Sequence, residues 1–437
     1  MNNLSRTHSC SALISLLKLE EGVFPPAYLN EELEYYLFER YANNFSHFML
    51  KAYYRTRPFI PRSLQLFVRR RYARLQSAHI RFPAWPVEPK VVQLVDDSLQ
   101  RVLETSENPV VHRISPWPER KRFSFVITHD VEGLVGLRYA PTLAALEEKN
   151  GFVSSWNLVP ELYPIDWKIV EELKSAGGEI GVHGLKHDGR EFETRSLFEK
   201  RLGKMNQYAR QWGACGFRAP STLRNVDWMP ELDFDYDCSF HDSDPYEPQP
   251  GGCCCIWPYF IKGLVELPIT LPQDHTLFEI LGHRDISVWT TKADWIERHS
   301  GMVLIDVHPD YLFKPELLSL YEAFLAYMKG KSDLWHVLPR DMARWWRQRA
   351  ASSLVKTALF GQDANQMCLP FIIDRIKFIC DHVRIPPDSS RNLLPLSVYR
   401  HRIWNAFISV EKSLPVGWSY RSRISCTLLL LESFRQA

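Results

Sequence analysis

The middle of the chain carries the most regular pattern, in which short apolar runs alternate with longer stretches of helical periodicity. The short runs predict buried strands, and apolar residues repeated every three or four positions before a glycine predict amphipathic helices. Strands and helices in alternation favour a largely parallel sheet, either open or closed into a barrel. The predicted strands cover residues 123–128, 152–159, 179–184, 216–220, 236–240, 263–271, 302–309 and 334–339, and the predicted helices cover 140–151, 165–178, 192–213, 292–301 and 314–330.

This pattern divides the 437-residue chain into three parts. Residues 1–118 form a helix-rich N-terminal region, with stretches such as LNEELEYYLFERYANNF and no motif that indicates chemistry. The segment NPVVHRISPWPERKR, which holds three prolines, leads into the α/β part at residues 121–350. The alternation is lost in residues 351–437, and no role for this C-terminal region follows from its pattern.

Composition and charge exclude several classes of protein. With 45% hydrophobic and 24% charged residues, the chain has the composition of a globular protein, and a net charge of +2 gives no overall field that would favour nucleic acid. One local exception is Arg69–Arg71, within the helix-like segment RTRPFIPRSLQLFVRRRYARLQ. Two interpretations stay open for it: a solvated helix face, or a site for an acidic partner such as a phosphate or an anionic lipid headgroup.

Cysteine usage and the N-terminus bear on the compartment. The nine cysteines include no CxxC pair, which indicates neither a disulfide framework nor a thiolate zinc site. The N-terminus lacks the features of a signal peptide, and no stretch approaches the ~20 apolar residues of a membrane helix. We therefore expect a cytoplasmic protein without a transmembrane segment.

Titratable residues end the first apolar run, in SFVITHDVEG. Charges at the end of a buried strand are costly unless they are paired, bind metal or do chemistry. Because side chains alternate along a strand, Asp130 and Glu132 share one side and His129 faces the other.

Polar residues also follow later strands, at the edge where α/β proteins build their sites. His183 and His187, in GVHGLKHDG, are spaced to share one face of a helical turn, a weak signal that by itself favours ordinary surface histidines over a cation site. A carboxylate from a neighbouring strand would favour the cation. Arg218 ends another run as either an ion-pair or a site residue, and His308, in DVHPD, is a candidate general acid or a structural histidine.

Taken in order, THDVE, HGLKH, FRAPS, YDCSF and DVHPD resemble the polysaccharide deacetylase family with the NodB homology domain, carbohydrate esterase family four. The resemblance covers about residues 121–345. It implies a distorted (β/α) barrel and a divalent metal, zinc in many members, that serves to remove acetyl groups from N-acetylated sugars. In the first motif Val131 replaces the second acid of the common pattern, and a subset of the family places that acid one residue later, at Glu132.

The resemblance also implies roles for individual residues. Glu132, His183 and His187 match the metal ligands. Asp130 matches the general base. Arg218 matches the arginine that orients this base, and His308 matches the general acid.

The segment DFDYDCSFHDSDPYEPQPGG is either the loop that lines the substrate groove or an ordinary surface loop. Pro220, Tyr236 and Trp257 are the candidate substrate-binding residues, and an aromatic ring such as that of Trp257 could stack on a sugar. Asp306 or Asp310 would keep His308 charged.

The leading hypothesis is a hydrolase of non-peptide carbon–nitrogen bonds, a metal-dependent deacetylase acting on a cytoplasmic glycan precursor. Two alternatives stay open: a cyclic amidase of the same fold, which opens a small ring with or without metal, and a non-catalytic carbohydrate-binding or assembly protein.

Overall fold

The computed structural model describes residues 12–20, 22–42, 56, 60–79, 82–106 and 110–353. Within it, the stretch up to Lys18, residues 24–102 and residues 114–353 form one compact unit. Residues 19–23 and 103–113 belong to a second unit, in which Leu19 and Arg113 form an antiparallel bridge. The expected C-terminal region lies almost wholly outside the described residues, and the predicted domain limits stay a prediction.

The first unit is built on a mixed sheet in the order β6-β7-β5-β4-β3-β2-β1-β8, with β9 also paired to β1. All pairs are parallel except β6 with β7. That antiparallel hairpin differs from the single strand predicted at 263–271. The strands are β1 (Phe123–Val131), β2 (Ser155–Leu158), β3 (Glu179–His183), β4 (Gly216–Arg218), β5 (Tyr236–Asp237), β6 (Tyr259–Ile261), β7 (Leu264–Glu266), β8 (Met302–Val307) and β9 (Leu334–His336).

The sheet curls towards a barrel. Beyond β7 the chain crosses to the opposite edge, where the backbone N–H groups of Thr270 and Leu271 donate to the carbonyl of Leu304 in β8. Strands that begin far apart in the sheet order are thereby brought together. The predicted α/β class, with strands curled into an incomplete (β/α) barrel, is confirmed.

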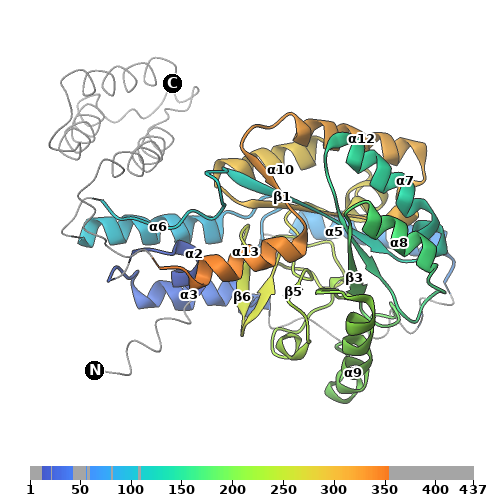
Figure 1. Ribbon diagram of the computed structural model, residues 1–437, viewed down its shortest axis with the longest axis horizontal. Coiled ribbons are helices and arrows are strands. Elements are labelled where there is room, and N and C mark those ends of the chain that lie inside the picture. The colour runs from blue at the N-terminus through green and yellow to red at the C-terminus, as the bar shows by residue number, and fades with distance from the viewer. Residues whose placement is uncertain are drawn as a thin grey trace. The chain divides into compact units, whose positions relative to one another are not determined.

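Helices cover the sheet, and in Figure 1 α7, α8, α10 and α12 lie together on one side of it. Local signals set their ends: Thr194 accepts from the N–H of Leu197 before α9, and Gly151 ends α7 with a left-handed φ of 83°. The helices are α2 (Ala12–Leu17), α3 (Ala27–Leu37), α5 (Arg62–His79), α6 (Lys90–Thr105), α7 (Leu134–Asn150), α8 (Trp167–Ser175), α9 (Arg195–Trp212), α10 (Ser287–Arg298), α11 (Pro309–Leu312), α12 (Pro315–Lys329) and α13 (Pro339–Ala351), with short turns η1 (Arg40–Ala42), η3 (Pro220–Thr222), η4 (Met229–Glu231) and η5 (His275–Ile280).

The core lies around β1, whose nine residues are all buried because β2 and β8 flank it and helices cover the sheet. No helix in the described part of the chain combines the length and apolar character needed to cross a membrane.

Candidate active site

The site forms where the central strands end. Asp130 lies near the end of β1, and His183 and Arg218 are the last residues of β3 and β4. Glu132 and His308 directly follow β1 and β8. The structure therefore brings together the strand-end residues that the sequence singles out, because parallel strands present their carboxyl ends at one edge.

Glu132, His183 and His187 form a compact group. One ligand atom from each lies within 4.8 Å of the other two. His187 Nε2 is 2.7 Å from Glu132 Oε1, and the two imidazole rings are 5.0 Å apart. Two imidazoles and a carboxylate at this separation can hold one divalent cation and leave coordination positions open.

The predicted helical turn between the two histidines is wrong. β3 ends at His183, residues 185–189 make bends, and Gly184 and His187 have left-handed φ angles of 57° and 52°. A Cβ on Gly184 would lie 2.4 Å from the Pro220 ring, so the loop follows its path only with glycine there. Pro220, a predicted substrate-binding residue, thus packs against the loop that carries His187.

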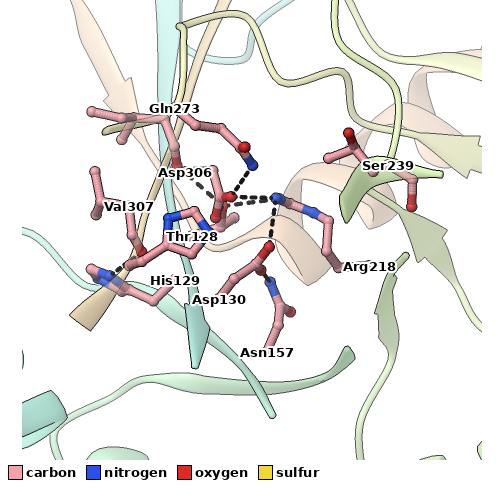
Figure 2. Close-up of polar contacts among 12 residues, drawn as sticks. Thr128, His129, Asp130, Asn157, Arg218, Ser239, Gln273, Asp306 and Val307 are labelled. Carbon is pink, nitrogen blue, oxygen red and sulfur yellow. Dashed lines mark hydrogen bonds and ion pairs between the residues drawn. The ribbon is translucent and has the colours of Figure 1, made fainter. Parts of the chain in front are cut away.

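Asp130 lies in a buried hydrogen-bond network that Figure 2 shows. Its Oδ1 accepts from the side-chain amide of Asn157 at 2.9 Å, and its Oδ2 is 3.4 Å from Arg218 Nη1. The same Nη1 lies 2.8 Å from Asp306 Oδ2, while Nη2 donates to the Thr128 hydroxyl at 3.0 Å. One guanidinium therefore fixes the base that the sequence predicts and a second carboxyl group from β8.

The two carboxyl groups beside Arg218 differ in their pKa. Burial opposes ionisation of Asp130, but the charges of Arg218 and His183 outweigh it and lower the pKa of Asp130 to about 2. Burial raises the pKa of Asp306 to about 7 despite Arg218, and the nearby Asp130 charge adds to the rise. Asp130, Asp306 and His308 also lie within 4.8 Å of one another, but Arg218 already supplies their cation.

His308 is held by a residue that the sequence did not indicate. Its Nδ1 lies 2.6 Å from Asp274 Oδ1, and its backbone N–H donates to Asp274 Oδ2 at 3.0 Å. Burial alone would lower the pKa of His308, but the Asp274 carboxylate raises it well above the usual histidine value, with a smaller contribution from Asp306. Asp274 is therefore the direct partner of His308, and Asp306, one of the two acids that the sequence suggests, adds a smaller effect.

Asp310 has a different task. Its carboxylate accepts from the backbone N–H groups of Glu132 at 2.8 Å and Gly136 at 3.1 Å. The helix α11 is thereby connected to the start of α7 and to the backbone of a candidate metal ligand.

His129 faces away from the site, as the alternation along β1 predicts. Its ring stacks on Trp156 at 4.0 Å, and its Nε2 lies 2.6 Å from Glu147 Oε1. Glu147 also accepts from the hydroxyls of Ser154 and Tyr321, at 2.5 and 2.6 Å. His129 therefore belongs to a buried structural cluster beneath the site.

A cavity opens over Asp130, Glu132, His187 and His308. One wall comes from the N-terminal region, because α5 contributes Gln65, Leu66 and Arg69. Another part of the lining is an aromatic pair, in which the rings of His275 and Tyr311 stack at 5.1 Å and 29°. From the acid-rich segment at 233–252, Glu247 and Pro248 reach the cavity.

Tyr236 and Trp257 lie elsewhere. Tyr236 is buried in β5, where its hydroxyl donates to Glu179 at 2.8 Å, and the indole of Trp257 donates to the carbonyl of Ser300 at 2.8 Å. Neither side chain lines the cavity as Asp130 and His308 do. Their role in binding substrate stays a prediction that the structure does not support.

Several site residues were missed. Asp274 and Gln273 follow the predicted strand at 263–271, so the rule of polar strand ends would have found both. Gln273 donates to Asp306 Oδ2 at 2.6 Å. Asn157 is a polar residue inside an apolar run and offered a weaker signal. Nothing in the sequence indicated that α5 would line the cavity.

Comparison with known proteins gives structural matches alone. No family model matches the sequence, and neither does any curated protein. A putative polysaccharide deacetylase from Mycobacterium smegmatis shares 18% identity over 56% of this chain and 97% of its own, with a TM-score of 0.43. The Puue allantoinase shares 16% identity over 54% and 94% of the two chains, with a TM-score of 0.42. A pseudoenzyme of carbohydrate esterase family four from Bacillus anthracis shares 13% identity over 53% of this chain and 70% of its own, with a TM-score of 0.34.

The expected resemblance to polysaccharide deacetylases thus has structural counterparts over about half of the chain. Matches at these identities and TM-scores say nothing about activity, because the three proteins named differ in what they do. The function is therefore argued from the geometry of the site.

Proposed function

We propose that the protein is a metal-dependent hydrolase that removes the acetyl group from an N-acetylated sugar or glycan precursor. The observation that carries the proposal is the convergence of Glu132, His183 and His187 within 4.8 Å of one another, beside Asp130 and His308. Hydrolysis of an amide needs a proton acceptor, a stabilised oxyanion and a proton donor, and this set can supply all three.

The side chains fit a divalent cation. The Nδ1–H of His183 donates to the backbone carbonyl of Arg218 at 3.1 Å, which directs Nε2 to the site. That Nε2 is buried and has no hydrogen-bond partner among the described residues. Burial lowers the pKa of His183 to about 4, so the imidazole is neutral at pH 7 and has a lone pair to offer. His187 holds the pKa of Glu132 well below its usual value against the effect of burial, so this ligand is ionised.

A cation bound by these three side chains would polarise the acetyl carbonyl and lower the pKa of a water molecule. Asp130 would accept the proton of the attacking water, and Arg218 would keep the carboxylate ionised and oriented. His308, protonated beside Asp274, would donate a proton to the nitrogen as the carbon–nitrogen bond breaks. The products are acetate and the free amine.

A sugar suits the lining of the cavity. The stacked pair of His275 and Tyr311 offers an aromatic surface, and the 5.4 Å between the rings of Tyr311 and His308 places it beside the proposed acid. We therefore propose that Tyr311 contacts the sugar. Of the sequence-based candidates, Tyr236 and Trp257 lie outside the lining of the cavity, and Pro220 packs against Gly184.

Metal content and acetate release test the proposal together. The purified protein is expected to retain zinc or a similar cation and to release acetate from N-acetylated oligosaccharides, with loss of activity on chelation. Asp130→Asn should retain the metal and lose activity, whereas His183→Gln should lose both. His283→Gln is the matched histidine control, since His283 lies outside the ligand group.

Three other outcomes would contradict the proposal. A metal-free protein indifferent to chelator that opens a small cyclic ureide would support the cyclic amidase. Sugar binding without acetate release would support the non-catalytic protein. Retained acetate release in Asp130→Asn would remove Asp130 from its role.

The expected cytoplasmic location stays a prediction, which cell fractionation would test.

A further inference from the structure

The side of α5 away from the cavity carries an apolar surface that the proposed function does not use. Five large apolar side chains on this single helix are between 49% and 62% exposed. The other four lie three, four, eight and eleven positions after Leu64, which places all five on one side of a helix with 3.6 residues per turn. We call this surface the outer face of α5, and it consists of Leu64, Phe67, Val68, Tyr72 and Leu75 together with the exposed Arg71.

The charged residues of α5 itself have one sign. Residues 62–79 contain five arginines and no acidic residue. Arg71 lies within the apolar face itself, and Arg74 is exposed at its border. A basic helix with an exposed apolar face is typical of peptides that lie in the interface of an anionic bilayer, where apolar side chains insert and arginine reaches the lipid phosphates.

The opposite side holds α5 firmly to the rest of the unit. Arg70 Nε donates to the backbone carbonyl of Glu279 at 2.7 Å, and Gln76 donates to that of Pro245 at 2.9 Å. Ala73 is buried in a cluster with Tyr246 and Ile280. The apolar side chains are therefore displayed on a fixed helix, and docking requires no folding of this segment.

We propose that the outer face of α5 docks the protein on the surface of an anionic membrane. Of the two interpretations left open for Arg69–Arg71, the exposed apolar residues favour the lipid headgroup, because a solvated helix face does not require five large apolar side chains. Since α5 also lines the cavity through Gln65, Leu66 and Arg69, docking would hold the cavity near the bilayer. If the proposed function holds, the acetylated sugar can then belong to a lipid-linked precursor.

Co-sedimentation of the full chain with vesicles tests the proposal. The protein is expected to bind vesicles that contain phosphatidylglycerol, to bind pure phosphatidylcholine much less, and to dissociate as salt rises. Phe67→Ser should lower the partition coefficient about tenfold, because a phenylalanine side chain no longer inserts. Arg71→Glu should lower it by a similar factor on anionic vesicles alone.

The chain offers matched controls. Phe24 is 54% exposed, against 62% for Phe67, and lies outside α5, so Phe24→Ser should leave binding unchanged. Arg138→Glu, an exposed arginine on α7, serves the same purpose for charge. Thermal unfolding verifies that each variant folds.

A wild-type protein that stays in the supernatant with anionic vesicles overturns the proposal, as does an equal loss of vesicle binding in Phe24→Ser and Phe67→Ser. Acetate release from a soluble oligosaccharide should be unchanged in Phe67→Ser, so this test and that of the proposed function can fail separately.

Discussion

Replacing Asp274 with asparagine isolates the electrostatic support of His308. Asp274 contacts both His308 Nδ1, at 2.6 Å, and the His308 backbone N–H, at 3.0 Å. Asparagine keeps the size of the side chain and an oxygen for the backbone contact, but it removes the negative charge. The variant therefore changes the proton affinity of His308 with little change in its position.

The expected magnitude follows from the bond that is lost. A hydrogen bond to a charged group contributes about 1.5–3 kcal/mol, and one pKa unit corresponds to about 1.4 kcal/mol. The pKa of His308 should therefore fall by about one to two units. Asp274 raises this pKa in the folded state against the effect of burial. The contact therefore stabilises the folded protein at pH values below the unfolded histidine pKa of about 6.5, and this stabilisation is lost as pH rises through the folded pKa. The variant should be less stable at low and neutral pH, and the difference from wild type should shrink at high pH.

The assay is the pH dependence of kcat/KM for acetate release, which reports the pKa of the acid in the free enzyme. The basic limb is expected to move to lower pH by about one to two units. In a His308→Asn background, Asp274→Asn should cause no further shift, because the two residues act through one contact. A uniform loss of activity with an unmoved basic limb would refute the reasoning and leave Asp274 a purely structural role.

Four further variants test separate parts of the structure. Arg218→Lys should lower kcat by about ten- to a hundredfold while metal content is retained, because a single ammonium cannot reproduce the guanidinium contacts; loss of metal would contradict this assignment. Glu132→Asp should weaken metal affinity about tenfold or more in a competition titration, since the shorter side chain no longer reaches His187; unchanged affinity would place the metal elsewhere. Tyr236→Phe should lower the free energy of unfolding by about 1 kcal/mol with KM unchanged, and Tyr311→Leu should raise KM with little loss of stability; the reverse result would restore Tyr236 as the sugar contact.

The strand ends were predictable because a short-range rule governs them. Alternation along β1 separates Asp130 and Glu132 from His129, and the structure shows that separation. The convergence of His183 and Arg218 follows from parallel order, which the alternation of strands and helices indicates. These inferences need only the period of the strand and the direction of its neighbours.

The other features of the site depend on tertiary contacts that no local sequence pattern encodes. Asp274 lies 34 residues before His308 and becomes its partner only because the chain after β7 crosses to β8. The bends that carry His187 replace a helical turn because Gly184 packs against Pro220, which begins η3 after β4. Tyr236 looked like a sugar contact by residue type, but its strand places it inside the core.

The clamp made by Asp310 means that the proposed ligand and the proposed acid are not aligned independently. The carboxylate accepts from the backbone N–H of Glu132, and Asp310 itself lies in α11 directly after His308, so displacement of either segment transmits to the other. A Cβ on Gly136 would lie 2.1 Å from an Asp310 oxygen, so even the smallest side chain there would force the clamp apart. Gly136 has no functional group, yet the relative position of Glu132 and His308 depends on the absence of a side chain at residue 136.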